Sequence, residues 1–258
     1  MDAAVHLDSA QLAAWAGDVF WPLVRVMAVI ATAPALSHRA FPVRAKVALG
    51  VAIALILAPQ VEAPPLTRAH DAAFFSMLVR NILIGVSMGL AVRILFTGIE
   101  LAGQMIGLQI GLSFGGFFNP EMADTDNPVA NMLSLLVLLL FLSMDGHLML
   151  IYGMERSFES FPVDGKGVPP LAFDAIAGMG AELFSIALSL SLPILGVMLL
   201  INVVLGVMAR VSPQLNLFAV GFPITLCAGM VVLLLFVPHL DAPMRAALER
   251  SLSIWPGG

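Results

Sequence analysis

Charged side chains are scarce in this 258-residue sequence, where Asp, Glu, Lys and Arg together make up 11% of the residues. A soluble domain carries about 25%. Apolar residues make up 60% of the chain, and the mean hydropathy is +0.98. So few charges could not cover the surface of a soluble fold of this length. The composition therefore excludes an ordinary soluble domain and predicts an integral membrane protein.

Several other features are missing, and each absence excludes a class of function. The single cysteine, Cys227, provides neither a disulfide framework nor a thiolate metal site. The net charge of −5, without any cluster of Lys or Arg, argues against nucleic acid as a partner. No P-loop, G-x-G-x-x-G, H-E-x-x-H or G-x-S-x-G motif is present. We therefore expect no enzyme, no cofactor and no metal site.

Apolar residues gather in six regions separated by short polar or Pro-rich breaks. A bilayer crossing needs about 20 mainly apolar residues, and Leu183–Met208 and Leu215–Val237 satisfy this. Val47–Ala58 is shorter than a crossing, whereas Ala72–Phe118 is long enough for two. These lengths predict an all-α polytopic membrane protein, a single domain over residues 1–258 without a separate soluble domain. The six regions are approximately Trp15–Ala33, Val47–Ala58, Ala72–Phe118, Val129–Tyr152, Leu183–Met208 and Leu215–Val237.

A few ionisable residues lie within or beside these apolar regions. A charge at the bilayer centre costs about 2.5–3.5 kcal/mol on insertion scales, so such residues face other helices, a water-filled cavity or the membrane surface. Asp18 and Arg25 are seven residues apart, which places them on one helical face but about 10 Å from each other. Two interpretations remain open: a polar conduit or proton relay, and pairing between helices or subunits. The candidate residues are Arg80, Arg93, Glu100, Asp145 and His147.

The most regular pattern in the chain is a glycine every fourth residue: Gly103, Gly107, Gly111 and Gly115. On a helix this spacing makes a narrow stripe without side chains, which allows membrane helices to approach closely. We therefore expect Gly103 and Gly107 to pack against another helix.

The second half of this pattern has a different character. The run Leu112-Ser-Phe-Gly-Gly-Phe-Phe-Asn-Pro120 combines adjacent glycines with three phenylalanines and ends at a proline. Gly-Gly weakens a helix, and the residue before Pro is biased away from helical conformation. We predict that a helix breaks here into an apolar loop. Non-helical backbone at membrane depth is tolerated where protein buries it or where it lines a cavity, so a plug and a buried re-entrant turn are both possible.

The same segment carries a resemblance to a known family. The residues that carry it lie in order along nearly the whole chain: Glu100–Phe114, Asn119-Pro120, Phe141–His147, Ser157-Phe158, Pro162, Arg210–Phe218 and Gly221–Pro223. In these residues the sequence resembles the FliR family of type III export-gate proteins.

The resemblance implies a fold of kinked helical hairpins within a helical, pore-forming assembly. It implies a core subunit of the flagellar export gate, in the bacterial inner membrane at the flagellar basal body. The implied partners are FliP and FliQ in the gate, FlhB and FlhA beside it, and the unfolded flagellar proteins that pass through. It also implies a plug in the closed pore. The implied plug residues are Gly111, Leu112, Ser113, Phe114, Gly115, Gly116, Phe117, Phe118, Asn119 and Pro120.

Two other functions are compatible with an apolar chain of this kind. A small-solute secondary transporter would use Arg80, Arg93 and Glu100 as a binding site beside broken helices, although the chain has no clear internal repeat. A purely structural membrane anchor would make the apolar loop unimportant for export and for leakage.

Overall fold

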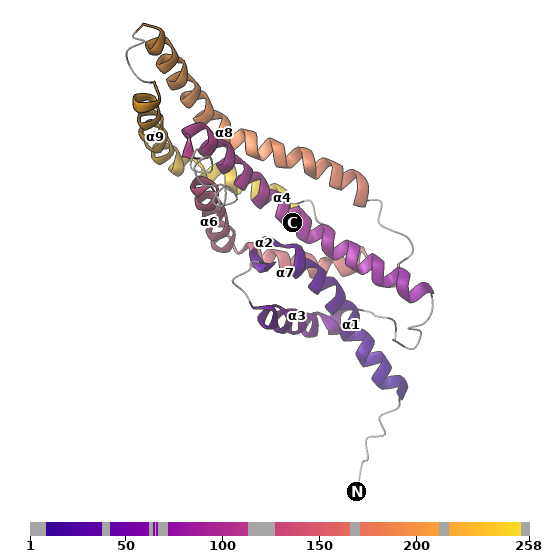
Figure 1. Ribbon diagram of the computed structural model, residues 1–258. Helices are drawn as coiled ribbons and strands as arrows, with labels where there is room; N and C mark the ends of the chain where they lie inside the picture. The colour runs from indigo at the N-terminus through magenta and orange to yellow at the C-terminus, as the bar shows by residue number, and fades with distance from the viewer. Residues whose placement is uncertain are drawn as a thin grey trace. The chain divides into compact units, whose positions relative to one another are not determined.

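The computed structural model describes residues 9–37, 42–61, 64, 66, 72–112, 127–165, 171–211 and 217–253, and every regular element within these ranges is a helix (Figure 1). This confirms the all-α prediction. Two short 3-10 turns, η1 (Ala58–Gln60) and η5 (Val237–His239), continue α3 and α9. The α-helices are α1 (Ser9–Thr32), α2 (Pro34–Ser37), α3 (Val43–Leu57), α4 (Ala72–Ile110), α6 (Pro128–Ser143), α7 (Gly146–Ser160), α8 (Leu171–Val211), α9 (Leu217–Phe236) and α10 (Asp241–Ser253).

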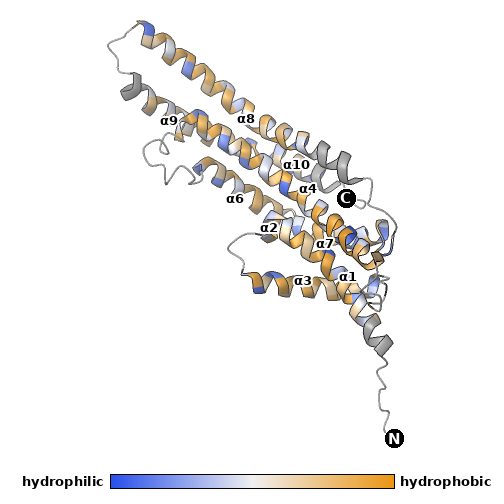
Figure 2. Cartoon of the chain, turned by 45° about the vertical axis from the view of Figure 1, so that its right-hand side comes forward, coloured by the Kyte–Doolittle hydropathy of each residue, from blue (hydrophilic) through white to orange (hydrophobic). Residues whose placement is uncertain are grey.

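Five helical segments in the described part of the chain are long and apolar enough to cross a membrane, and the pair α6 and α7 would add a sixth if counted as one span. Figure 2 shows apolar residues along these helices, interrupted by scattered polar ones. The prediction of a polytopic membrane protein is therefore confirmed. The five segments are Ala14–Thr32, Val43–Gln60, Ala72–Ile110, Gly180–Val211 and Gly221–His239.

Two of these helices differ from their predicted lengths. The segment Val43–Gln60 has 18 residues and meets the length of a span, so the prediction that this region is too short does not hold. Its helix begins before the apolar run, at Val43, and includes Arg44 and Lys46; such long side chains can reach polar surroundings from a helix end. The region after Ala72 forms one uninterrupted helix of 39 residues rather than two passes. At 1.5 Å per residue α4 is about 58 Å long.

The apolar region Val129–Tyr152 divides into α6 and α7 at Met144 and Asp145. Asp145 has a φ of 55°, in the left-handed region that Asp tolerates better than most residues. Its carbonyl accepts hydrogen bonds from the amides of Leu148 (2.8 Å) and Met149 (3.0 Å), which starts α7. Hydropathy does not register this break, because the residues on both sides of it are apolar.

The chain packs as two compact units. One contains the described residues within Met1–Arg93, Asp145–Met179 and Arg250–Gly258, and the other those within Ile94–Met144 and Gly180–Glu249. Helices α4 and α8 contribute to both. The single domain expected over residues 1–258 stays a prediction.

Each unit has its own apolar core. In the first unit, Trp21 is buried and packs against Phe74 with the rings tilted by 56° at a centroid distance of 5.2 Å, while its Nε1 donates a hydrogen bond to the carbonyl of Pro64 (3.1 Å). In the second unit, Phe96 of α4 meets Phe141 of α6 edge to face at 5.8 Å. Aromatic pairs in this arrangement add about 0.5–1.5 kcal/mol beyond the area that they bury.

Candidate functional site

Helix α4 ends where the glycine pattern of the sequence continues. The last helical residue is Ile110, and Gly111 follows with a φ of 96°. The amide of Gly111 donates hydrogen bonds to the carbonyls of Gly107 and Leu108, both at 3.1 Å. This is the left-handed C-terminal cap for which glycine is preferred. The helix thus ends just before the Leu112–Pro120 run, and Gly111 terminates the helix instead of extending its glycine stripe.

The two glycines upstream of this cap lie where α4 approaches the start of α6. A Cβ added to Gly103 would lie 2.5 Å from Cα and 2.9 Å from the amide nitrogen of Ala130. A Cβ added to Gly107 would collide with the side-chain amide of Asn127. Real Cβ atoms do not tolerate such distances. The helices can approach this closely because both positions lack a side chain.

Asn127 connects the beginning of α6 to the last turns of α4. Its Oδ1 accepts a hydrogen bond from the amide of Val129 (3.0 Å), which caps α6. Its Nδ2 donates to the carbonyl of Gln104 in α4 (3.2 Å). Both ends of the connection 113–126 are therefore fixed, one by the cap at Gly111 and the other by Asn127.

The expected plug residues run from the cap at Gly111 into this connection. Gly111 is buried and Leu112 is half-buried at its beginning. The remaining plug residues lie outside the described part of the chain, so their role stays a prediction. They are Ser113, Phe114, Gly115, Gly116, Phe117, Phe118, Asn119 and Pro120.

The three charged residues of α4 are not brought together. Arg80 is buried, whereas Arg93 and Glu100 are exposed. All three lie on one unbroken helix, so about 30 Å separates position 80 from position 100 along its axis. A binding site for one small solute cannot be formed by side chains this far apart. Helix α4 therefore does not provide the converging charges that the transporter hypothesis needs.

Asp145 and His147 lie on either side of the first residue of α7. The side chain of Asp145 is exposed, and its contribution to the fold is the left-handed backbone described above. His147 is half-buried, and its Nδ1 has no hydrogen-bond partner within the described part of the chain. Among the described residues, no three His, Cys, Asp or Glu side chains are grouped so as to hold a metal ion.

A buried network of hydrogen bonds in the first unit surrounds Arg25 of α1. Its Nε and Nη2 donate to Oδ1 of Asn81 (3.1 and 2.7 Å). Its Nη1 donates to the carbonyl and to Oγ of Ser157 (2.8 and 3.0 Å), and Nη2 also donates to the carbonyl of Phe161 (2.8 Å). The guanidinium lies 3.8 Å from the ring centre of Phe158. All five N–H donors are thus satisfied by neutral acceptors.

Sequence reasoning placed Arg25 on one face with Asp18 and missed these partners. Asn81 and Ser157 are both fully buried. Asn81 is an amide within the apolar helix α4, a signal that could have found it because a buried amide needs a hydrogen-bond partner. Arg80 lies beside the same part of the fold: its guanidinium touches the backbone at Gly165, and its Nε and Nη1 are buried without a partner in the described residues.

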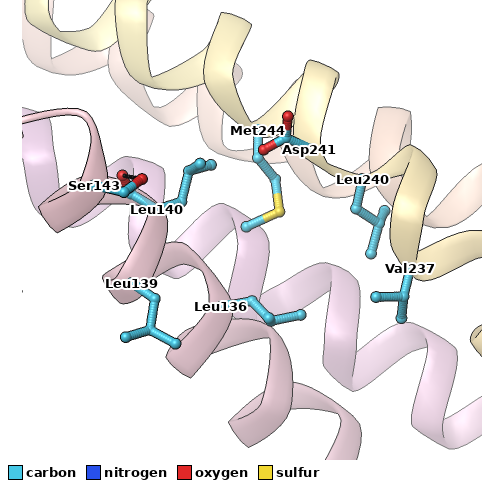
Figure 3. Close-up of a pocket in the computed structure, with 8 residues that line it drawn as sticks. All are labelled: Leu136, Leu139, Leu140, Ser143, Val237, Leu240, Asp241 and Met244. Carbon is cyan, nitrogen blue, oxygen red and sulfur yellow. Dashed lines mark hydrogen bonds between the residues drawn. The ribbon is translucent and has the colours of Figure 1, made fainter.

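An apolar groove of about 280 Å³ lies in the second unit between α6 and the η5–α10 segment. Figure 3 shows the side chain of Met244 from α10 directed towards the leucines of α6. Asp241 at the groove is bonded to Arg245 (2.8 Å), and this hydrogen bond raises the pKa of the exposed Arg245 guanidinium. The groove is mostly aliphatic and offers no cluster of charges for a polar ligand. Its lining residues are Leu136, Leu139, Leu140, Ser143, Val237, Leu240, Asp241 and Met244.

The described part of the chain is that of a polytopic α-helical membrane protein, in which α4 ends at a glycine cap. Comparison with known proteins shows its family. The family model described as bacterial export proteins, family 1, matches residues 16–251. The chain belongs to this family of bacterial export proteins.

Individual relatives cover most of the chain. A protein of Pectobacterium carotovorum subsp. carotovorum named Flagellar biosynthetic protein FliR is 43% identical over 226 residues, which cover 87% of this chain and 85% of the relative. The protein of the same name from Escherichia coli (strain K12) is 37% identical over 244 residues, covering 93% and 91%. The one from Bacillus subtilis (strain 168) is 26% identical over 226 residues, covering 86% of each. The resemblance found in the sequence is thereby confirmed.

Proposed function

We propose that this chain is a core subunit of the flagellar type III protein export gate. It forms, with FliP and FliQ, the inner-membrane channel through which unfolded flagellar proteins pass. The observation that carries this proposal is the match of residues 16–251 to a family of export proteins, together with relatives named Flagellar biosynthetic protein FliR at 37% and 43% identity. Five described helical segments support it, because they meet the length and composition of membrane spans.

Assembly with other subunits is supported by the apolar surface of α8 and α9. Only 11% of the most apolar stretch of Gly180–Val211 is buried, and 17% of that of Gly221–His239. Exposed residues such as Leu200, Val203, Val207 and Leu234 need lipid or protein around them. In a gate assembly, FliP and FliQ cover part of this surface, and FlhB and FlhA contact the assembly from outside.

The connection between α4 and α6 is the proposed plug. Leu112, Phe114, Phe117 and Phe118 fill the lumen of the closed gate and keep water out, as hydrophobic constrictions do. Gly115 and Gly116 allow the segment to swing aside when a substrate arrives. The fixed ends at Gly111 and Asn127 support this proposal, since a plug must return to the same place after each passage.

The experiment that tests the gate proposal is recovery of the chain from its own membranes after extraction in a mild detergent. We expect FliP and FliQ in the recovered complex, in amounts that do not depend on the expression level of the tagged chain. Recovery of the chain alone as a stable monomer would contradict the proposal. Solute uptake by the purified chain alone in vesicles would support the transporter hypothesis instead.

A further inference from the structure

The last residue of α4 is held by a third helix of the second unit, α9. Ile110 has no exposed surface. A Cβ added to Gly229 of α9 would lie 2.5 Å from Cγ1, 2.7 Å from Cγ2 and 3.0 Å from Cβ of Ile110. The backbone of α9 therefore touches the Ile110 side chain directly, and glycine is the residue that permits this contact.

Ile110 immediately precedes the left-handed cap. The amide of Gly111 is bonded to the carbonyls of Gly107 and Leu108, so the cap residue is tied to the last turn of α4. Any displacement of Ile110 must move Gly111 and the start of the connection with it. The same turn also contacts Asn127 through Gly107, so both the start of α6 and α9 pack against the end of α4.

We propose that Gly229 is a positioning residue through which α9 sets where the α4–α6 connection begins. The inference rests on the proposed function in giving this position a role in closing the gate. A shift or rotation of α9 then changes the exit direction of the chain at Gly111 and Leu112.

Simple helix packing would also use a glycine, so the test must separate a local packing defect from a change in the position of the connection. Position 206 in α8 provides the matched control, because a Cβ on Gly206 meets nothing within 4 Å. Both Gly229→Ala and Gly206→Ala raise helix propensity by a similar amount. Only the former inserts an atom against Ile110, so any difference between the variants reports on this contact.

The experiment measures two quantities in the assembled complex within membranes. A cysteine replaces Leu112 in a background in which the exposed Cys227 is changed to Ser. The reaction rate of this cysteine with a membrane-permeant maleimide reports the position of the end of α4. Leak of a small dye through the assembled gate reports closure. Recovery of the complex after mild extraction verifies that assembly is unchanged.

We expect Gly229→Ala to change the labelling rate at position 112 and to raise the leak severalfold, and Gly206→Ala to change neither. Ile110→Ala removes Cγ1 and Cγ2, the two atoms nearest the new methyl group. Combined with Gly229→Ala it should therefore bring both quantities back towards the wild-type values. Such rescue by a smaller residue is not expected from a general loss of stability.

The outcomes separate the inference from the proposal on which it rests. Unchanged labelling and leak in Gly229→Ala would overturn the inference, and a leak in a variant lacking Gly111–Phe118 would then show that the plug proposal stands. A changed labelling rate that Ile110→Ala reverses would support the positioning role even if the deletion variant did not leak, in which case only the plug proposal would fall. A defect that Ile110→Ala does not reverse would also overturn the inference.

Discussion

Arg25 of α1 donates two hydrogen bonds to a single oxygen of Asn81 in α4, at 3.1 Å from Nε and 2.7 Å from Nη2. Both residues are completely buried. The charge of Arg25 is surrounded by amide, hydroxyl and carbonyl oxygens, so its stabilisation depends on many dipoles instead of one carboxylate. Such an arrangement joins α1, α4 and α7 through one side chain.

Replacement of Arg25 by Lys should destabilise the first unit strongly although the charge is retained. Lysine has three donors on one nitrogen and cannot reach all the acceptors arranged around the edge of the planar guanidinium. Buried acceptors of Asn81, Ser157 or Phe161 would lose their partners, at about 1–3 kcal/mol for each group. Thermal unfolding of the purified complex would measure the effect. The exposed Arg93→Lys is the control, and equal melting temperatures for the two variants would contradict this account of Arg25.

Replacement of Gly85 by Ala should separate α1 from α4. The new Cβ would lie 2.5 Å from the carbonyl oxygen of Arg25 and 2.8 Å from Cβ of Ala28, so the backbones would have to move apart. Overpacking of this kind costs about 1–3 kcal/mol. In the same unit, a Cβ on Gly178 meets nothing within 4 Å, so Gly178→Ala should be neutral. Thermal unfolding of both variants checks the prediction, which fails if Gly85→Ala is the more stable of the two.

The steric clash caused by Gly107→Ala should be relieved by a second substitution, whereas the clash caused by Gly103→Ala should not. At Gly107 the obstacle is the side chain of Asn127, and Asn127→Ser removes its amide group while keeping a capping hydroxyl. At Gly103 the obstacle is the backbone of Ala130, which no substitution removes.

The measurement is the amount of assembled complex recovered from membranes. We expect Gly107→Ala to be partly rescued by Asn127→Ser, and Gly103→Ala to be rescued by no substitution at Ala130. Rescue of Gly103→Ala by Ala130→Gly would show that the close approach of α4 and α6 is not limited by their backbones.

The sequence was sufficient to predict the helical membrane fold, because apolar runs of about 20 residues have few other structures available to them. It predicted that a helix ends at the Leu112–Pro120 run, but neither the cap at Gly111 one residue before that run nor the break at Asp145. Both depend on a left-handed backbone conformation at one residue, which composition and periodicity do not reveal. The start of α3 at Val43 was missed for a different reason: its first turn carries Arg44 and Lys46, which end an apolar run without ending a helix.

The polar contacts were the least predictable part. The spacing of Asp18 and Arg25 indicated a shared face, but the actual partners, Asn81 and Ser157, are 56 and 132 residues away from Arg25. Spacing along one helix carries no information about which other helix lies opposite. At Gly103 and Gly107 the glycine spacing predicted packing against another helix, and a Cβ there would meet Ala130 and Asn127.

Removal of Gly111–Phe118 should open the gate. The deletion removes the left-handed cap together with all the phenylalanines of the connection, so the proposed hydrophobic closure is lost. We expect ions or a small dye to enter cells that carry the assembled variant faster than cells that carry the wild-type chain. A pore that is equally tight after the deletion, in complexes recovered at wild-type levels, would contradict the plug.

The most direct test is to delete the gene for this chain and measure flagellar proteins in the culture medium. The account predicts that these proteins remain inside the cells, that motility is lost, and that the wild-type chain restores both. Unchanged export and motility in cells without the chain would contradict its assignment to the export gate.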